Sequence, residues 1–274
     1  MTTTKNISLA GIGPVALVGA GKMGGAMLDG WLARGLAPAQ AVVIDPKPSP
    51  ELAAKGVVLN PAPSALSKMR VVILAVKPQV AAEVLPSIKG LVGADTLVVS
   101  VMAGKTLAFL QTAFPDAALV RAMPNTPAAI GRGMTVAVPN AKVTAAQKQL
   151  THDLLAATGA VEWIDDEALM DAVTAVSGSG PAYIFHLAEA LAKAGIAAGL
   201  PPHLAETLAR ATVAGSGELL HRSPLHPAIL RQNVTSPGGT TAAALDVLMA
   251  PEGLETLMTK AVAAATKRSR ELAG

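Results

Sequence analysis

The chain has 274 residues, of which 51% are hydrophobic and 15% are charged, and its formal net charge at pH 7 is +3. This small charge and an aromatic content of 2% argue against nucleic-acid binding, which needs basic surfaces and rings for base stacking. The absence of cysteine excludes disulfides and thiolate catalysis, and the five histidines lack the spacing of metal ligands. We therefore expect no metal, and no run of apolar residues is long enough to predict a membrane span.

The first residues superficially imitate a signal peptide, because the largely apolar residues 7–20 follow Lys5. The second half of that stretch, however, carries a glycine pattern that cleavage would destroy. We therefore expect a cytoplasmic protein with a flexible tail over residues 1–13. A first domain over residues 14–164 and a second over residues 165–274 then follow from the patterns described below.

Residues 14–18 read as a short buried strand, which leads into the glycine pattern and then into an apolar helix over residues 25–34. This order of strand, glycine-rich turn and helix is typical of dinucleotide-binding domains. The first glycine permits a tight turn, the second lets a pyrophosphate approach the backbone, and the third lets the helix pack closely on the strand. The cofactor-binding candidates here are Gly19, Ala20, Gly21, Lys22, Met23 and Gly24.

A second predicted strand, over residues 41–44, ends in Asp45. An acidic residue at this place typically hydrogen-bonds the ribose hydroxyls of the cofactor's adenosine, and it repels a 2′-phosphate, which favours NADH. Lys47 could instead pair with that phosphate, so both NADPH and NADH stay open. Asp45 could also serve only as a turn former before Pro46. Asn60, which follows another short apolar run, is a weaker candidate for a ribose contact.

Three further strands are predicted over residues 71–76, 96–101 and 119–123, and each runs into a loop that contains proline or glycine. In an open α/β sheet, ligands lie beyond the carboxyl ends of the strands. The loops therefore indicate a site for the ribose and nicotinamide of the cofactor. The alternative for each loop alone is that its proline or glycine only ends the strand and forms a turn.

After a last strand over residues 161–164 the pattern becomes helical. Asp165 or Asp166 can cap a helix that extends to Ala175, and a break over residues 177–181 follows, with Pro181 in the first turn of the next helix. That helix, residues 182–198, is mostly apolar around its circumference, and residues 203–221 are rich in small residues that allow close packing. We expect these helices to interleave with those of a second subunit in an obligate homodimer.

The turn Ser236-Pro237-Gly238-Gly239 precedes two threonines and an alanine-rich helix. We expect Thr240 or Thr241 at the N-cap of this helix. Its first-turn N–H groups lack partners and its dipole adds partial positive charge, so the segment can seat a carboxylate. An ordinary capped loop is the alternative. The substrate-binding candidates here are Gly238, Gly239, Thr240 and Thr241.

A nicotinamide domain combined with a carboxylate seat implies hydride transfer to or from a small acid. Carbonyl reduction normally needs a positioned proton donor, and the loops after the strands are poor in such groups. A protonated imine already carries positive charge, so a hydroxyl beside its nitrogen is enough to orient it. Thr241 is the catalytic candidate, and Thr240 is the second choice.

At this point the chain resembles the pyrroline-5-carboxylate reductase family over residues 15–272. The resemblance implies a Rossmann domain with a doubly wound parallel sheet, an all-α dimerisation domain, and often rings of dimers. It also implies reduction of (S)-1-pyrroline-5-carboxylate to L-proline with NADPH or NADH, the last step of proline biosynthesis. It is carried by residues 19–24, 75–79, 121–127, 177–183 and 235–248.

Carried over residue by residue, the resemblance implies that the backbone around Gly239 and Thr240 holds the substrate carboxylate, and that Thr241 faces the ring nitrogen. Many family members carry serines or an arginine after the second strand, whereas this chain has Asp45, so a preference for NADPH does not follow. The resemblance implies that the cofactor and the substrate ring are lined by Ala75, Val76, Lys77, Pro78, Val101, Ala103, Met123 and Asn125, of which the last two are also substrate-binding candidates.

Two rival functions remain. A β-hydroxyacid dehydrogenase shares the glycine pattern and a helical second domain, but it carries a catalytic lysine after a glycine-rich break. The residues that follow Gly180 here are Pro181-Ala182-Tyr183-Ile184-Phe185, without lysine. The other rival is a protein that binds NAD(P) as a sensor or scaffold without turnover, in which case the glycine-threonine seat would have no purpose.

Overall fold

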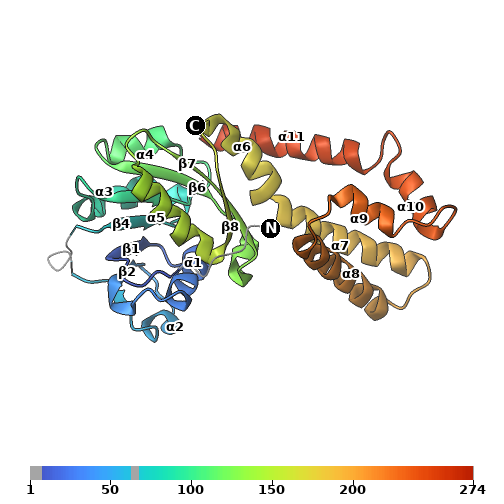
Figure 1. Ribbon diagram of the computed structural model, residues 1–274, viewed down its shortest axis with the longest axis horizontal. Coiled ribbons are helices and arrows are strands. Elements are labelled where there is room, and N and C mark those ends of the chain that lie inside the picture. The colour runs from blue at the N-terminus through green and yellow to red at the C-terminus, as the bar shows by residue number, and fades with distance from the viewer. Residues whose placement is uncertain (1–7, 63–67, 274) are drawn as a thin grey trace. The chain divides into compact units, whose positions relative to one another are not determined.

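The computed structural model in Figure 1 describes residues 8–62 and 68–273 of the chain. They form two compact units. The sheet unit contains the described residues up to Gly178 together with the end of the chain from Thr266, and the helical unit is Ser179–Ala265. The predicted boundary lay after residue 164. Residues 165–178 instead belong to the sheet unit, because Met170 is buried against Val136 and Val138.

Within the described residues the sheet has eight strands in the order β3-β2-β1-β4-β5-β6-β7-β8. Neighbouring strands are parallel, except that β7 runs antiparallel to β6. The order reverses between β1 and β4, which is where open α/β sheets bind ligands. The strands are β1 (Val15–Val18), β2 (Ala41–Ile44), β3 (Val58–Leu59), β4 (Val71–Leu74), β5 (Leu97–Ser100), β6 (Ala118–Met123), β7 (Gly133–Pro139) and β8 (Gly159–Trp163).

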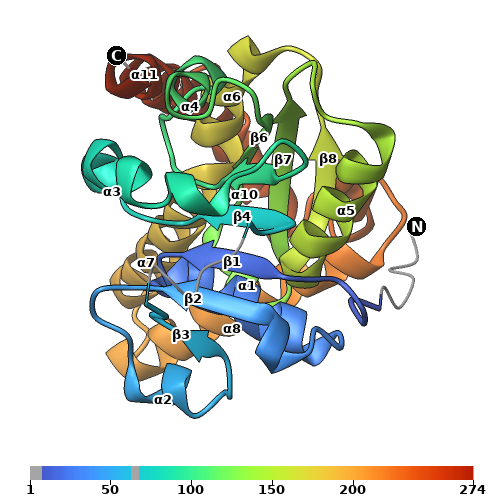
Figure 2. The ribbon, with the colours of Figure 1, turned by 90° about the vertical axis from the view of Figure 1, so that its left-hand side faces the viewer.

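Helices cover both faces of this sheet, which explains why its central strands are continuously apolar. Figure 2 shows α3 (Ala81–Ser87) and α5 (Ala145–Leu155) on opposite sides of the strands. Alternate residues of β1 face two different cores: Leu17 packs with Trp31 of α1 (Lys22–Ala33), whereas Val18 packs with Leu110 of α4 (Leu107–Ala113). The other α-helices among the described residues of this unit are α2 (Pro50–Ala53), α6 (Met170–Val173) and the end of α11 (Leu254–Ala273).

The strands predicted over residues 14–18, 41–44, 71–76, 96–101, 119–123 and 161–164 are confirmed as β1, β2, β4, β5, β6 and β8, with small shifts at their ends. The prediction of a flexible tail over residues 1–13 is wrong for residues 8–13, which the structure describes. Leu9 is fully buried, it packs in the core with Trp31, and its N–H donates to the carbonyl of Arg34 at 2.8 Å. Residues 1–7 lie outside the described residues.

The helical unit contains α7 (Gly180–Ala197), α8 (Pro202–Arg222), α9 (Pro227–Asn233), α10 (Thr240–Leu248) and most of α11. Pro181 lies in the first turn of α7 as expected. Ala192 of α7 and Ala205 and Ala209 of α8 are buried. Large apolar side chains stay exposed in the single chain, among them Phe185 at 64%. Such a surface is typical of helices that pack against another subunit. None of the helices in the described part of the chain combines the length and the apolar character that a membrane crossing requires.

Candidate active site

The glycine-rich loop joins β1 to α1 and lies next to the end of β4. Gly19 has φ of +91°, and a Cβ there would lie 2.8 Å from the carbonyl oxygen of Ala75. A Cβ on Gly24 would overlap the carbonyl oxygen of Gly19 and would lie 3.3 Å from the Cβ of Ala75. Among the described residues, no atom lies within 4 Å of a Cβ built on Gly21. The three glycines thus serve a tight turn, close helix packing and an open backbone surface, as the pattern predicts.

The amino terminus of α1 presents free backbone N–H groups at this open surface. Gly21 is its N-cap, and within residues 8–62 and 68–273 no side chain caps it. The first turn of a helix has N–H groups without intrahelical partners, and the helix dipole adds partial positive charge there. The first turn of α1 also contains no acidic residue. This arrangement can receive the pyrophosphate of a dinucleotide.

Asp45 lies beside that surface and is held by backbone groups on both sides. Its Oδ2 accepts a hydrogen bond from the N–H of Ala20 at 2.7 Å, and its Oδ1 accepts one from the N–H of Lys47 at 2.8 Å. The second bond is an Asx turn, so Asp45 does shape its turn, but the first places its carboxylate against the glycine-rich loop. The structure therefore holds the carboxylate of Asp45 against the glycine-rich loop.

Asn60 binds the backbone of Asp45 through both ends of its amide. Its Oδ1 accepts from the N–H of Asp45 at 2.9 Å, and its Nδ2 donates to the carbonyl of Asp45 at 2.8 Å. The backbone of Asn60 itself is left-handed, with φ of 44°. Asn60 thus fixes the end of β2 against the end of β3, and its side chain is already engaged within the chain.

The other sheet candidates meet at one edge of the sheet. The parallel register aligns Val18, Leu74 and Ser100 with Arg121, so the carboxyl ends of β1, β4, β5 and β6 lie side by side. The edge therefore carries Ala75, Val76, Lys77 and Pro78 after β4, Val101 and Ala103 after β5, and Met123 and Asn125 at and after the end of β6.

Met123 and Asn125 contact a π-helical segment, Thr174–Gly178, which joins α6 to α7. A Cβ on Gly178 would lie 2.5 Å from the Cε of Met123, so only glycine allows this approach without a shift of that side chain. The Nδ2 of Asn125 donates to the Oγ of Ser177 at 3.3 Å. The chain is helical through Ala175 as predicted, but the helix changes from α6, which ends at Val173, to the π-helical segment that follows directly. Sequence reasoning identified a break at residues 177–181 but did not place Ser177 in the site.

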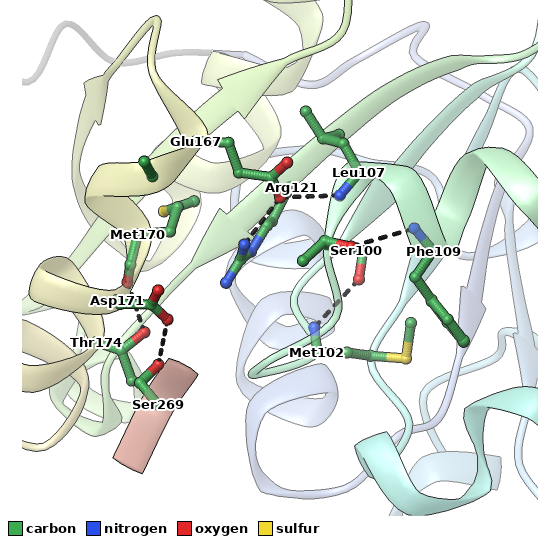
Figure 3. A network of polar contacts seen from close by, with 12 residues as sticks. Ser100, Met102, Leu107, Phe109, Arg121, Glu167, Met170, Asp171, Thr174 and Ser269 are labelled. Carbon is green, nitrogen blue, oxygen red and sulfur yellow. Dashed lines mark hydrogen bonds and ion pairs between the residues drawn. The ribbon is translucent and has the colours of Figure 1, made fainter. Parts of the chain in front are cut away.

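Figure 3 shows an ion pair between Arg121 of β6, which is buried, and Glu167, which is half-buried. Arg121, which is 5% exposed, donates from Nη1 to Oε1 of Glu167 at 2.8 Å. The same oxygen accepts from the N–H of Leu107 at 2.8 Å, at the start of α4. Asp166 caps the short helix that follows it, as expected, by accepting from the N–H of Ala168. No sequence pattern indicated this ion pair, because its residues lie 46 positions apart.

The threonine turn of the helical unit differs from the prediction in one respect. The N-cap of α10 is Gly239, so Thr240 and Thr241 lie in the first turn of the helix and neither caps it. Gly238 has φ of 66°, a conformation that favours glycine. In the described part of the chain, no side chain caps α10, and neither threonine hydroxyl makes a hydrogen bond. The turn therefore offers both N–H groups and hydroxyls, which a side-chain-capped loop would not.

No cluster of three or more His, Asp or Glu side chains that could hold a metal ion occurs among the described residues. The groups that remain for chemistry are backbone N–H groups, hydroxyls, one carboxylate beside the glycine-rich loop, the side chain of Lys77, and the otherwise partly apolar edge of the sheet. Such a set can bind a dinucleotide and a small acid.

Comparison with known proteins gives consistent matches. Residues 167–272 match the family model for pyrroline-5-carboxylate reductase dimerisation, and residues 14–104 match the model for NADP oxidoreductase, coenzyme F420-dependent. A pyrroline-5-carboxylate reductase from Pseudomonas aeruginosa is 39% identical over 94% of this chain and 96% of its own length.

Two solved structures are similar over nearly the whole chain. One is a pyrroline-5-carboxylate reductase from Coxiella burnetii, with a TM-score of 0.88 and 33% identity, covering 96% of this chain and 99% of that one. The other is pyrroline carboxylate reductase from Plasmodium falciparum with NADP bound, with a TM-score of 0.80 and 28% identity, covering 95% and 98%.

Proposed function

Because this chain belongs to the pyrroline-5-carboxylate reductase family, it is an NAD(P)H-dependent oxidoreductase that reduces (S)-1-pyrroline-5-carboxylate to L-proline, and we propose which of its residues perform this reaction. The reaction is the last step of proline biosynthesis. The observation that carries the residue assignment is the open backbone at Gly21, at the uncapped amino terminus of α1 and beside the carboxylate of Asp45.

The cofactor-binding residues are those of the glycine-rich loop and of the sheet edge. The N–H groups around Gly21, Lys22 and Met23 hold the pyrophosphate, because they lack helical partners and because the space around Gly21 is open among the described residues. When bound, the nicotinamide supplies the hydride. We assign the remaining contacts to Gly19, Ala20, Gly24, Asp45, Ala75, Val76, Lys77, Pro78, Val101 and Ala103. We also assign one to Asn60, whose amide at the same time holds the backbone of Asp45.

The substrate carboxylate binds the first turn of α10. Thr240 and Thr241 follow a glycine N-cap, so their N–H groups and hydroxyls are available to an anion. Thr241, which is half-buried, places its hydroxyl beside the ring nitrogen and orients the protonated imine for hydride addition. Gly238 and Gly239 keep side chains away from this seat, while Met123 and Asn125 contact the ring.

The protein acts as a homo-oligomer, which is supported by the match to the dimerisation model and by the exposed apolar side chains of α7 and α8. We propose an obligate homodimer, because a large apolar helix surface in a single chain needs a permanent partner. A ring of such dimers in the cytoplasm is the assembly that we propose for the active enzyme.

The decisive experiment follows NAD(P)H consumption by the purified protein with pyrroline-5-carboxylate, and NAD(P)⁺ reduction with 3-hydroxyisobutyrate. We expect turnover with the cyclic imine and none with the hydroxyacid. The reverse result would identify a hydroxyacid dehydrogenase, and cofactor binding without turnover of either substrate would identify a sensor.

The role of Thr241 is tested in the same assay. We expect Thr241→Ala to lower kcat/KM by roughly ten- to a hundred-fold, as for the loss of one hydrogen bond to a charged group. Thr241→Ser keeps the hydroxyl and should retain most of the activity, and the Kd for the cofactor should be unchanged in both variants. Normal kinetics in Thr241→Ala would remove Thr241 from the mechanism.

A further inference from the structure

Ser177 lies in the π-helical segment Thr174–Gly178, at the point where the chain leaves the sheet unit. π-helical turns are rare and occur mostly at functional sites. This one brings two consecutive residues against the carboxyl edge of the sheet: Ser177 is hydrogen-bonded to Asn125, and Gly178 faces Met123. Within the described part of the chain, the segment is therefore in direct contact with both proposed ring-contacting residues.

The orientation of the Asn125 amide is determined by its two partners. Its oxygen must be the atom that accepts from the N–H of Met134 at 2.8 Å, because that backbone group can only donate. Its nitrogen therefore faces Ser177, and one N–H donates to the Oγ of Ser177 at 3.3 Å. An amide nitrogen has a second N–H, for which the described residues provide no acceptor. That group is available to a ligand.

The bond between Asn125 and Ser177 joins two distant segments of the chain, unlike the bond of the neighbouring Thr174. Thr174, in the same π-helical segment, donates to the carbonyl of Met170, four residues earlier in its own helical turn, at 2.8 Å. Ser177 instead uses its hydroxyl across 52 positions of sequence, on a half-buried side chain of the site. A single bond of this length contributes little to folding, so its main effect is on where the Asn125 amide points.

We propose that Ser177 is a positioning residue of the reductase reaction, which acts by holding the side-chain amide of Asn125 in the orientation that presents its second N–H to the bound ring. This inference rests on the proposed function, because it takes Asn125 as a residue that contacts the ring. Met134 fixes the oxygen of the amide and Ser177 fixes its nitrogen, so the loss of either partner allows the amide to rotate.

The test is a double-mutant cycle in steady-state kinetics with pyrroline-5-carboxylate. We expect Ser177→Ala to lower kcat/KM about tenfold, as for one weakened hydrogen bond, with the KM for NAD(P)H and the Tm unchanged. Ser177→Thr keeps a hydroxyl and should restore most of the activity. Asn125→Ala should lower kcat/KM at least as much, and the double variant should be no worse than Asn125→Ala alone, because Ser177 acts through Asn125.

Ser179→Ala is the matched control, because Ser179 lies in the same glycine-rich break and its side chain does not cap α7. It should keep the kinetics of the unchanged protein. Normal kinetics in Ser177→Ala, additive losses in the double variant, or a lower Tm with normal kinetics of the folded protein would each overturn the inference. If Asn125→Ala were itself fully active, the proposed role of Asn125 would fail together with the role of Ser177, while turnover by the unchanged protein would still establish the reductase.

Discussion

Ser269 donates a 2.6 Å hydrogen bond to Oδ1 of Asp171, and this bond joins residues that are 98 positions apart (Figure 3). The two residues lie on either side of the whole helical unit in the sequence, because the chain leaves the sheet unit after Gly178 and returns to it at Thr266. Arg270 also approaches Oδ2 of Asp171 at 3.8 Å. Through these two contacts Asp171 of α6 binds the end of α11, which belongs to the same sheet unit.

Replacing Ser269 should destabilise the protein through this contact. Ser269 is 7% exposed, so Ser269→Ala leaves a carboxylate oxygen without its hydrogen bond and should lower the free energy of unfolding by about 1–3 kcal/mol. Arg268→Ala is the control, because it breaks an ion pair with Glu271 that is largely exposed, and such pairs contribute about 0–1 kcal/mol. Urea unfolding measures both, and equal effects in the two variants would contradict the special role of Ser269.

Breaking the ion pair between Arg121 and Glu167 should lower the free energy of unfolding by more than Ser269→Ala does. Glu167→Ala leaves a buried guanidinium without its partner, so the free energy of unfolding should fall by about 3–5 kcal/mol. The double variant Arg121→Met with Glu167→Ala removes the unpaired charge and should recover much of that stability. Comparing urea midpoints of the single and double variants checks this, and a double variant that is less stable than Glu167→Ala would count against it.

Gly21→Ala should weaken cofactor binding without changing the stability of the fold. In the free protein the added methyl group meets no atom within 4 Å among the described residues, so the Tm should not change. The methyl group would occupy the space of the pyrophosphate, and the Kd for NADH and NADPH should rise about tenfold or more. Calorimetric titration measures the Kd values. Gly90→Ala is the control, since Gly90 is equally open but lies after α3. A Kd that stays the same in Gly21→Ala would place the pyrophosphate elsewhere.

Asp45→Ser tests which cofactor the protein prefers. The carboxylate of Asp45 lies against the glycine-rich loop and would repel a 2′-phosphate, while Lys47 is exposed and could attract one. We expect the ratio of kcat/KM for NADPH to that for NADH to rise by about tenfold, as for the removal of one like-charge repulsion. Asp116→Ser, which affects an exposed carboxylate near Lys142, should leave the ratio unchanged. If Asp45→Ser did not change the ratio either, Asp45 would only shape its turn.

The parallel half of the sheet could be predicted because its strands are short, apolar and followed by proline or glycine. Strand β7 was not predicted: it begins at Gly133 and ends at Pro139, two residues that normally mark loops, and its direction depends on pairing with β6. The burial of Leu9 was also missed, because a single apolar residue near the start of a chain carries no periodic signal.

Site residues were predicted where the chemistry is local in sequence. The glycine-rich loop and the threonine turn each occupy a few consecutive positions, so their patterns are readable, although the N-cap of α10 was placed one or two residues too late. Contacts between distant segments were not readable. Two such contacts depend on how the chain returns to the sheet edge: that of Asn125 with Ser177 and that of Arg121 with Glu167. No rule of sequence spacing predicts pairs of this kind.

The antiparallel direction of β7 has a consequence for how this edge can tolerate insertions and deletions. In a fully parallel sheet, only the carboxyl ends of strands lie at this edge. Because β7 is antiparallel to β6, its amino end lies there instead, and the N–H of Met134 faces Asn125. The pairing of Met123 with Val136 sets that alignment. A relative that gained or lost one residue between them would slip the two strands past each other and aim a different backbone group at the amide, so length in this connection should be far more restricted than its composition.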